Sequence, residues 1–222
     1  MNDEDLRIAE TNKLTLGSVV PTFGMGVPYP KFLLEEGSNR RKFSDEGDFV
    51  ILFVGELSHR KNQAFLIKEV ARLRETMPDI RLWLVGEGED DKSLKTLAES
   101  LRVSDRIVFF GRRKNPQDFM RDADIYVSPS TSEGLPFNIV EALGCGKTVL
   151  ASDVKGHSDI LGDGVGVLYK HDSSEDFEEK LKMIRSGEIT VPAVRIAEGY
   201  RNFSETAVFS DTYSKIKEAG EI

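Results

Sequence analysis

Two glutamates separated by seven residues, Glu133 and Glu141, have the spacing in this sequence that best suits ligand binding. Pro136 lies between them, and proline suits the first turn of a helix because that turn does not need its missing N–H. The apolar residues that follow predict a short helix, which Gly144 or Gly146 ends. Glu133 therefore falls on the loop before the helix, and Glu141 falls within its first or second turn.

The start of such a helix can bind an anion. Its first N–H groups point outward without a partner, and the helix dipole favours negative charge at that end. Glu133 and Glu141 then place a carboxylate on each side of an anion site. This arrangement suits a ligand with hydroxyl groups at both ends and phosphate in the middle, such as a nucleotide-sugar. The plain alternative is that Glu133 is a solvated loop residue and Glu141 a residue of the helix surface.

The residues around the two glutamates read S-E-G-L-P-x-x-x-x-E-A-x-x-C-G from Ser132 onwards. This segment resembles the E-x7-E region of the retaining glycosyltransferases of family 4, also called group 1. The likeness is greatest to the exopolysaccharide and capsule branch of that family. The resemblance implies that Glu133 is the catalytic residue beside the donor sugar, and that Glu141 hydrogen-bonds the ribose of the donor nucleotide. It also implies that three loop residues bind the donor: Gly134, Leu135 and Pro136.

Composition argues against several other classes of protein. Among the 222 residues, 39% are hydrophobic and 31% charged, which is typical of a soluble globular protein. The net charge of −8 argues against a nucleic-acid partner. The longest apolar run, Phe49 to Val54, is far too short to be a transmembrane segment. The single cysteine, Cys145, fits a reducing cytosol. We expect a cytoplasmic protein, and peripheral attachment to the inner face of the membrane stays open.

Short apolar runs alternate with helix-like spacing from Asp48 onwards. This alternation predicts an α/β fold with a doubly wound, Rossmann-like parallel sheet of six strands and a ligand crevice at the carboxyl ends of the strands. The resemblance implies that this fold is the C-terminal half of a GT-B glycosyltransferase. The expected strands cover residues 49–54, 80–85, 106–110, 124–127, 148–151 and 164–168.

The loop after the first expected strand carries Gly55, Arg60 and Lys61. It resembles the G-[RE]-L-x-x-x-K-[GN] loop of the family, which implies that Lys61 binds the donor diphosphate and that Arg60 assists it. A lysine beside a partly shielded diphosphate contributes about 1.5–3 kcal/mol. Glu56 stands where many members have a phosphate-binding arginine, so the phosphate charge falls to Lys61, Arg60, a helix N-terminus or another basic residue. Alternatively, Arg60 and Lys61 are a solvated loop pair.

The loops after the next two strands carry weaker signals. The segment 86–91 has two of the three glycines of a dinucleotide-binding turn, but Asp91 replaces the third and the preceding strand is the second. Gly111 and Arg112 lie, by resemblance, where family members flank the nucleobase, and a solvated turn is an equal alternative. His157 has no role that the sequence assigns.

No cofactor is expected besides the donor substrate. The three histidines lack the H-x3-H spacing of a zinc site, and no D-x-D pair precedes a glycine-rich turn. We therefore expect a metal-independent transferase whose donor is a nucleotide-sugar, with uridine diphosphate as its nucleotide.

The first residues resemble the end of the first domain in family members, followed by the hinge turn G-M-G-V-P-Y-P-K-F. We expect a remnant of that domain and the hinge at 1–30, the donor-binding domain at 31–199 and a C-terminal helix at 200–222. In the family the first domain binds the acceptor. The resemblance thus implies that a sugar or lipid-linked acceptor binds through a domain missing here, and both an engineered fragment and a truncated gene stay open.

The leading hypothesis is the donor-binding domain of a retaining glycosyltransferase that transfers a hexose-type sugar in polysaccharide biosynthesis. One alternative is a catalytically incomplete nucleotide-sugar-binding module that needs a partner acceptor domain. Another is a sugar-nucleotide epimerase or hydrolase of related fold. Donor turnover by the purified chain distinguishes these hypotheses.

Overall fold

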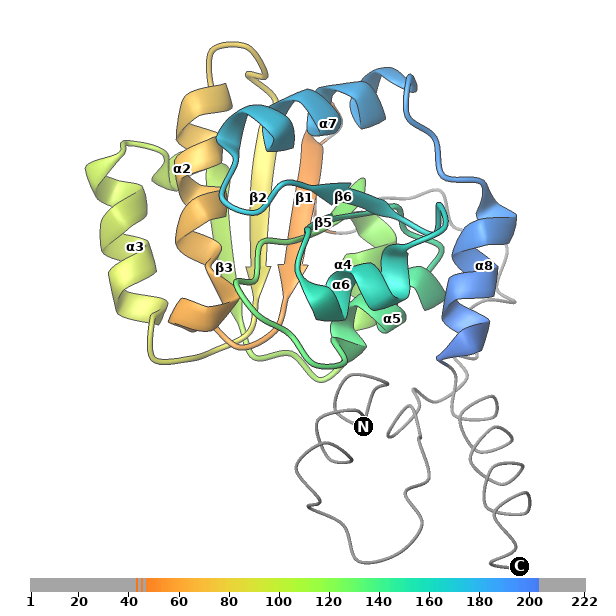
Figure 1. The fold of residues 1–222 in the computed structure, drawn as a ribbon. Helices are drawn as coiled ribbons and strands as arrows, with labels where there is room; N and C mark the ends of the chain where they lie inside the picture. The colour runs from red at the N-terminus through yellow and green to blue at the C-terminus, as the bar shows by residue number, and fades with distance from the viewer. Residues whose placement is uncertain (1–42, 44, 46, 204–222) are drawn as a thin grey trace, which may run out of the picture.

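The structure is a computed structural model that describes residues 43, 45 and 47–203 (Figure 1). Several expectations fall on other residues and lie outside the described part. They are the hinge turn near residue 30, the segment that precedes it and residues 204–222 of the expected C-terminal helix.

Six parallel strands form one sheet in the order β3-β2-β1-β4-β5-β6. This confirms the predicted doubly wound, Rossmann-like sheet. Each strand is an almost continuous apolar run, because helices cover both faces of the sheet. The strands are β1 (Phe49–Val54), β2 (Ile80–Val85), β3 (Ile107–Gly111), β4 (Ile125–Ser128), β5 (Val149–Ser152) and β6 (Val167–Tyr169).

The last strand is shorter than expected. β6 begins at Val167, whereas the apolar pattern predicted a start at residue 164. Gly164 has a positive φ of 79°, which belongs to a turn and not to extended backbone. The other strands lie within one residue of the predicted bounds.

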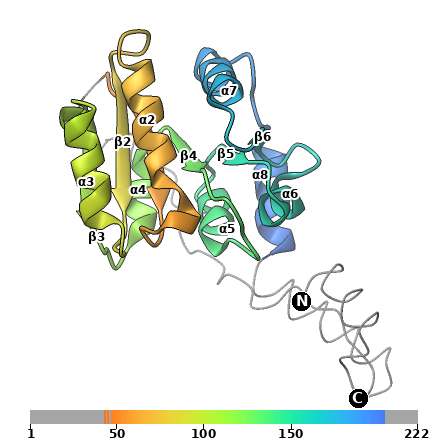
Figure 2. The same ribbon diagram turned by 60° about the vertical axis from the view of Figure 1, so that its left-hand side comes forward.

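The helices form two layers around the sheet. The apolar residues of α2, α3 and α7 pack in one core cluster, and those of α4, α5, α6 and α8 pack in the other. Figure 2 shows α2 and α3 at one end of the molecule and α8 beside α5 at the other. The helices are α2 (Gln63–Leu73), α3 (Asp91–Ser100), α4 (Pro116–Asp122), α5 (Phe137–Gly144), α6 (Lys155–Leu161), α7 (Ser174–Ser186) and α8 (Ala193–Asn202), with short 3-10 helices η2 (His59–Lys61) and η3 (Ser104–Arg106).

The strand order reverses between β1 and β4. From β1 the chain adds β2 and β3 on one side and then returns to add β4, β5 and β6 on the other. In such sheets a ligand crevice opens at the carboxyl ends of the two strands that flank the reversal. The carbonyl oxygen of Val54, at the end of β1, accepts hydrogen bonds from the Tyr126 hydroxyl at 3.0 Å and from Asn138 Nδ2 at 2.8 Å. These bonds connect β1 to β4 and to α5.

The turns after β1 and β2 touch through their backbones. A Cβ atom built on Gly86 would lie 1.8 Å from the Gly55 carbonyl oxygen. Gly86 also has φ of 149°, in the region that favours glycine. A side chain at Gly86 would therefore push apart two loops at the carboxyl end of the sheet.

α8 extends to Asn202, so the expected boundary between residues 199 and 200 falls inside a helix. The division of the chain into three segments stays a prediction. Among the described residues, every helix is too short or too polar to cross a membrane.

Candidate functional site

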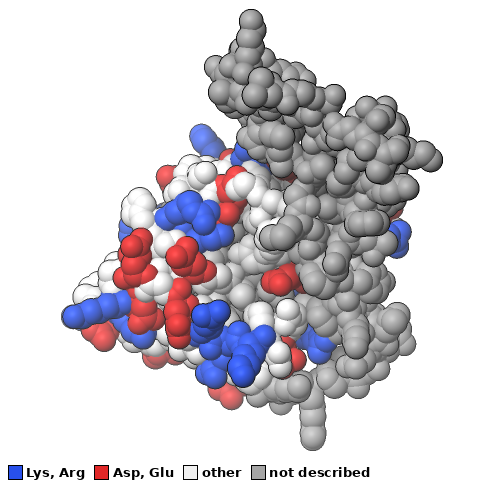
Figure 3. All heavy atoms as spheres, turned by 90° about the horizontal axis from the view of Figure 1, so that it is seen from below, with Lys and Arg blue, Asp and Glu red and all other residues white. Residues whose placement is uncertain are grey.

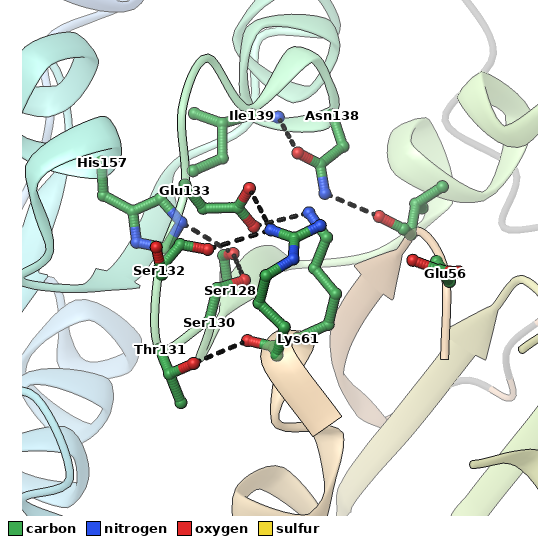
Figure 4. A network of polar contacts seen from close by, with 12 residues as sticks. Glu56, Lys61, Ser128, Ser130, Thr131, Ser132, Glu133, Asn138, Ile139 and His157 are labelled. Atoms are coloured by element: carbon green, nitrogen blue, oxygen red, sulfur yellow. Dashed lines mark hydrogen bonds and ion pairs between the residues drawn. The ribbon is translucent and has the colours of Figure 1, made fainter. Parts of the chain in front are cut away.

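Lys61 and Glu133 meet at the strand reversal (Figure 4), and Arg60 also contacts Glu133. Lys61 Nζ lies 2.5 Å from Glu133 Oε1, and Arg60 Nη1 lies 2.9 Å from Glu133 Oε2. The Glu133 and Lys61 side chains are 6% and 11% exposed, whereas Arg60 is 49% exposed. The alternative of a solvated loop pair is therefore wrong for Lys61, and Arg60 reaches into solvent while it pairs.

The electrostatics of this cluster keep Glu133 ionised. Burial alone raises the pKa of its carboxyl group, but hydrogen bonds from Lys61, Ser130 and Arg60 outweigh burial and set the pKa below its ordinary value. Glu133 is thus a hydrogen-bond acceptor and a negative charge at neutral pH. It is not a proton donor.

The backbone also joins the two loops of this cluster. The Thr131 N–H donates to the Arg60 carbonyl at 2.9 Å, and Asn62 Nδ2 donates to the Pro129 carbonyl at 3.3 Å. Arg60 Nη1 donates to the Ser132 carbonyl at 2.9 Å. The loops after β1 and β4 are therefore one hydrogen-bonded unit, although some 70 residues separate them in the sequence.

Glu141 lies in the second turn of α5 and has a different environment. Burial raises the pKa of its carboxyl group, and no other influence on that pKa is resolved. Within the part of the chain that the structure describes, the carboxylate receives no hydrogen bond or ion pair. The sequence predicted Pro136 in the first turn of the helix. α5 instead begins one residue later, at Phe137, and Pro136 is its N-cap.

A hollow of about 440 Å³ opens at the carboxyl ends of β1, β2 and β3. Gly55, Glu56 and Glu87 line it together with Arg112 and Arg113. Figure 3 looks onto this face, where acidic side chains lie between basic ones. The hollow is thus polar and carries both charges.

Arg112 lines the hollow, and Gly111 precedes it at the end of β3. Their place beside a base stays a prediction. The Gly86 N–H donates to the Gly111 carbonyl at 3.0 Å, and the Arg112 N–H donates to Glu87 Oε1 at 3.4 Å. Because that second bond is long, the Arg112 N–H remains able to bind another acceptor.

The three loop residues between Glu133 and α5 differ in exposure. Gly134 is exposed, Leu135 packs partly buried against the core, and Pro136 is buried. Gly134 is thus the one of the three most open to a ligand. The structure brings the predicted site residues to one edge of the sheet, where side-chain ion pairs join Arg60 and Lys61 to Glu133.

Four buried polar residues beside Glu133 were not predicted: Ser128, Ser130, Ser152 and His157. His157 Nε2 lies 3.1 Å from Ser128 Oγ, and Nδ1 lies 2.8 Å from the Ser152 carbonyl oxygen. Ser152 Oγ donates to the Ser130 carbonyl at 2.6 Å. A sequence signal was present, since Ser128 and Ser152 each end an otherwise apolar strand.

Within the described ranges, no three side chains of the metal-binding types lie close enough together to hold an ion. Metal independence stays a prediction.

A doubly wound sheet with paired charges at its strand reversal defines a Rossmann-like ligand-binding domain. The model of the family "Glycosyl transferases group 1" matches residues 35–203, so the chain belongs to that family. "Putative glycosyltransferase EpsD" of Bacillus subtilis is 32% identical over 190 residues, which cover 83% of this chain and 50% of EpsD.

Solved structures agree in fold. Anabaena Alr3699/HepE in complex with UDP-glucose is 25% identical with a TM-score of 0.67, over 79% of this chain and 50% of that one. WaaG, a glycosyltransferase involved in lipopolysaccharide biosynthesis, is 22% identical with a TM-score of 0.70, over 100% of this chain and 61% of that one. The fold is that of GT-B glycosyltransferases. The chain spans about half the length of the curated relatives it matches.

Proposed function

We propose that this chain binds the donor of a retaining glycosyltransferase, a nucleotide-sugar with a uridine diphosphate, in polysaccharide biosynthesis. The observation that carries the proposal is the contact of Lys61 and Arg60 with Glu133 at the strand reversal. A phosphate-binding cation and a sugar-binding carboxylate must be neighbours, because the sugar is bonded to the terminal phosphate.

Lys61 and Arg60 supply the positive charge for the diphosphate, together with the N-terminus of α5. Charge-assisted hydrogen bonds from a mostly buried lysine are among the stronger polar contacts. As the bond from sugar to phosphate breaks, negative charge grows on the leaving diphosphate, and fixed cations stabilise it. Neither side chain must reorganise far, because the loop hydrogen bonds already hold both.

Glu133 faces the sugar in this proposal. It is ionised, so it accepts hydrogen bonds from sugar hydroxyls and stabilises positive charge that develops on the sugar ring. It cannot donate a proton to the leaving group. Retention of the anomeric configuration is part of the proposal and rests on the family resemblance.

The nucleoside takes the hollow at the ends of β1 to β3 and the Glu141 side of α5. Glu141 lacks a partner among the described residues, so two ribose hydroxyls would supply its missing hydrogen bonds. The hollow of about 440 Å³ is in the usual size range of small-ligand sites. The Arg112 N–H offers a donor at its edge.

The named relatives support the donor class and the biosynthetic role. The Anabaena structure is titled as a complex with UDP-glucose, and Rhizobium meliloti LpsE is named a lipopolysaccharide core biosynthesis glycosyltransferase. The acceptor, a sugar or a lipid-linked sugar, would bind through a separate domain of the kind those longer relatives have room for. We propose no metal in the reaction.

Titration calorimetry of the full chain with UDP and with UDP-glucose, in the presence of a chelator, tests this function. Lys61→Ala should weaken UDP binding by about 1.5–3 kcal/mol, because it removes a charged hydrogen-bond donor. Uridine alone should bind the variant as it binds the wild type.

Lys68→Ala is the matched control, since Lys68 is an exposed lysine on α2. It should leave every affinity unchanged. Binding of UDP only after magnesium is added would contradict metal independence. The absence of binding to both UDP and UDP-glucose would overturn the proposed function.

The second candidate is a nucleotide-sugar-binding module without transferase activity of its own. Both candidates bind UDP-glucose. They differ in turnover, because only the first releases UDP from UDP-glucose when a sugar acceptor is supplied.

A further inference from the structure

The cluster of Ser128, Ser130, Ser152 and His157 has no part in the binding roles proposed above, yet each member is 0% exposed. Burial of a polar side chain costs free energy unless its hydrogen bonds are made. Figure 4 shows Ser128, Ser130 and His157 beside Glu133. Ser128 ends β4, Ser152 ends β5, and His157 lies in the first turn of α6.

The chemistry of the acceptors determines the proton positions. Nδ1 of His157 faces the Ser152 carbonyl oxygen, which can only accept, so Nδ1 carries a proton. Burial lowers the pKa of His157, so the ring is neutral and Nε2 accepts. The Ser128 hydroxyl therefore donates to Nε2.

Ser130 connects this cluster to Glu133. Its Oγ lies 3.4 Å from Ser128 Oγ, and the Ser130 side chain helps to lower the pKa of the Glu133 carboxyl group. Its carbonyl accepts from Ser152 Oγ. Ser128 thus contacts the side chain of Ser130, and Ser152 binds its backbone. His157 contacts both of these serines.

The backbone beside His157 reinforces the connection. A Cβ atom built on Gly156 would lie 2.3 Å from the Gly134 carbonyl oxygen and 2.6 Å from that of Glu133. The start of α6 therefore lies directly against the loop that carries Glu133.

We propose that His157 is a positioning residue for Glu133: through Ser128, Ser130 and Ser152 it holds the carboxylate where it meets Lys61 and Arg60. His157 contacts no donor atom in this role. The consequence for donor binding rests on the proposed function, whereas the consequence for the Glu133 carboxylate does not.

His157→Asn in the full chain tests the proposal. Asparagine keeps a donor for the Ser152 carbonyl but places no acceptor at the Nε2 position, so Ser128 and then Ser130 lose their order. Carbon-13 NMR of labelled glutamate carboxyl groups reports the titration of Glu133, whose signal is identified by its loss in Glu133→Gln. Arg60 and Lys61 of η2, Tyr126 of β4 and Glu141 of α5 are the other titratable groups that act on or near it.

The midpoint of the Glu133 titration should move upward in His157→Asn, because a hydrogen bond to the ionised form is weakened. UDP-glucose should bind roughly tenfold more weakly, equal to about 1.4 kcal/mol, while UDP changes by less than about twofold. His171→Asn makes the same substitution outside the cluster and should change neither quantity.

An unchanged Glu133 midpoint in a folded His157→Asn protein would overturn the positioning role, as would equal losses for UDP and UDP-glucose. If wild type binds no UDP-glucose but the midpoint still moves, the proposed function fails and the positioning of Glu133 stands. If His157→Asn does not fold, Ser128→Ala carries the test, because it breaks only the connection from Nε2 to Ser130. The same upward movement is expected, and its absence overturns the proposal.

Discussion

The two glutamates of the E-x7-E segment have contrasting environments. Both are residues of intermediate exposure at the same edge of the sheet, although the Glu133 side chain itself is only 6% exposed. Glu133 is held by two cations and a hydroxyl, and its pKa lies below the ordinary value. Glu141 has no such partner among the described residues, and burial raises its pKa. The pKa values of two identical side chains in one motif are thus shifted in opposite directions.

The difference arises from what each carboxylate faces. Glu133 lies on a loop that hydrogen-bonds to the loop after β1, and that loop carries Arg60 and Lys61. Glu141 lies in the second turn of α5, and neither cation is among the influences on its pKa. The protein itself thus satisfies the Glu133 carboxylate with charged partners, whereas the Glu141 carboxylate has none among the described residues.

The largest expected effect is on stability. Glu133→Gln should lower the free energy of unfolding by about 2–4 kcal/mol, because Lys61 would keep a mostly buried charge without its counter-charge. Glu141→Gln should change it by less than about 0.5 kcal/mol or raise it. Denaturant unfolding at neutral pH measures both, and equal losses would remove the contrast.

The second effect is on ligand binding. Glu141→Gln should weaken UDP and UDP-glucose alike by about 1–3 kcal/mol, because it weakens hydrogen bonds to the ribose. Glu133→Gln should leave UDP no weaker, since it frees two cations, and should weaken UDP-glucose. Calorimetry with both ligands tests this, and a loss of UDP affinity in Glu133→Gln would contradict the assignment of Glu133 to the sugar.

The third effect is on the pH dependence of stability, and its sign is opposite for the two residues. A lowered pKa in the folded state means that Glu133 stabilises above the ordinary value of 4.5, and that this contribution is lost as pH falls through the folded pKa. A raised pKa means that the folded protein gains stability, relative to neutral pH, as pH falls towards 4.5 and Glu141 takes up its proton.

Unfolding curves from neutral pH to well below 4.5 measure this contrast. The deficit of Glu133→Gln relative to wild type should shrink as pH falls. If Glu141→Gln is more stable than wild type at neutral pH, that difference should also shrink as pH falls. The decrease should begin at a higher pH than for Glu133, because the pKa of Glu141 is raised. A constant difference for either variant would show that its carboxyl group has the same pKa in folded and unfolded chains.

The smallest effect concerns a third carboxylate, remote from the site. Glu69 on α2 is 1% exposed and accepts from Ser174 Oγ at 2.5 Å, but Oε2 has no hydrogen bond and lies 3.7 Å from Arg72 Nε. Burial raises its pKa, and Ser174 and Arg72 only partly oppose this. Glu69→Gln should change the unfolding free energy by less than about 1 kcal/mol at neutral pH. A loss of unfolding free energy as large as that of Glu133→Gln would show that a partly paired buried carboxylate stabilises the fold as much as a fully paired one.

The strands and the site loops were largely predictable because apolar runs bounded by glycine are local signals. Five strands lie within a residue of expectation, and the family resemblance placed Lys61 and Glu133 at one edge of the sheet. The direct ion pair was not predictable from spacing, since two side chains from loops some 70 residues apart can point into the crevice without touching.

The buried cluster around His157 was missed for another reason. Its members are common residues, and serine at the end of a strand usually signals a turn. Only the packing of α6 against the Glu133 loop converts Ser128, Ser152 and His157 into one network. That packing depends on Gly156, whose missing side chain has meaning only once the facing carbonyls are placed.

The paired charges also govern how quickly an anion reaches the site. Arg60 and Lys61 carry two positive charges and Glu133 one negative, so the cluster offers a single net charge on a chain of −8. At a distance, the net negative charge of the chain therefore repels a nucleoside diphosphate. The positive cluster attracts it only over the last few ångströms. Salt shortens the range of that repulsion from about 30 Å at 0.01 M to about 8 Å at 0.15 M. Association should accordingly become faster as salt rises over this range, the reverse of a site that steers its ligand from afar.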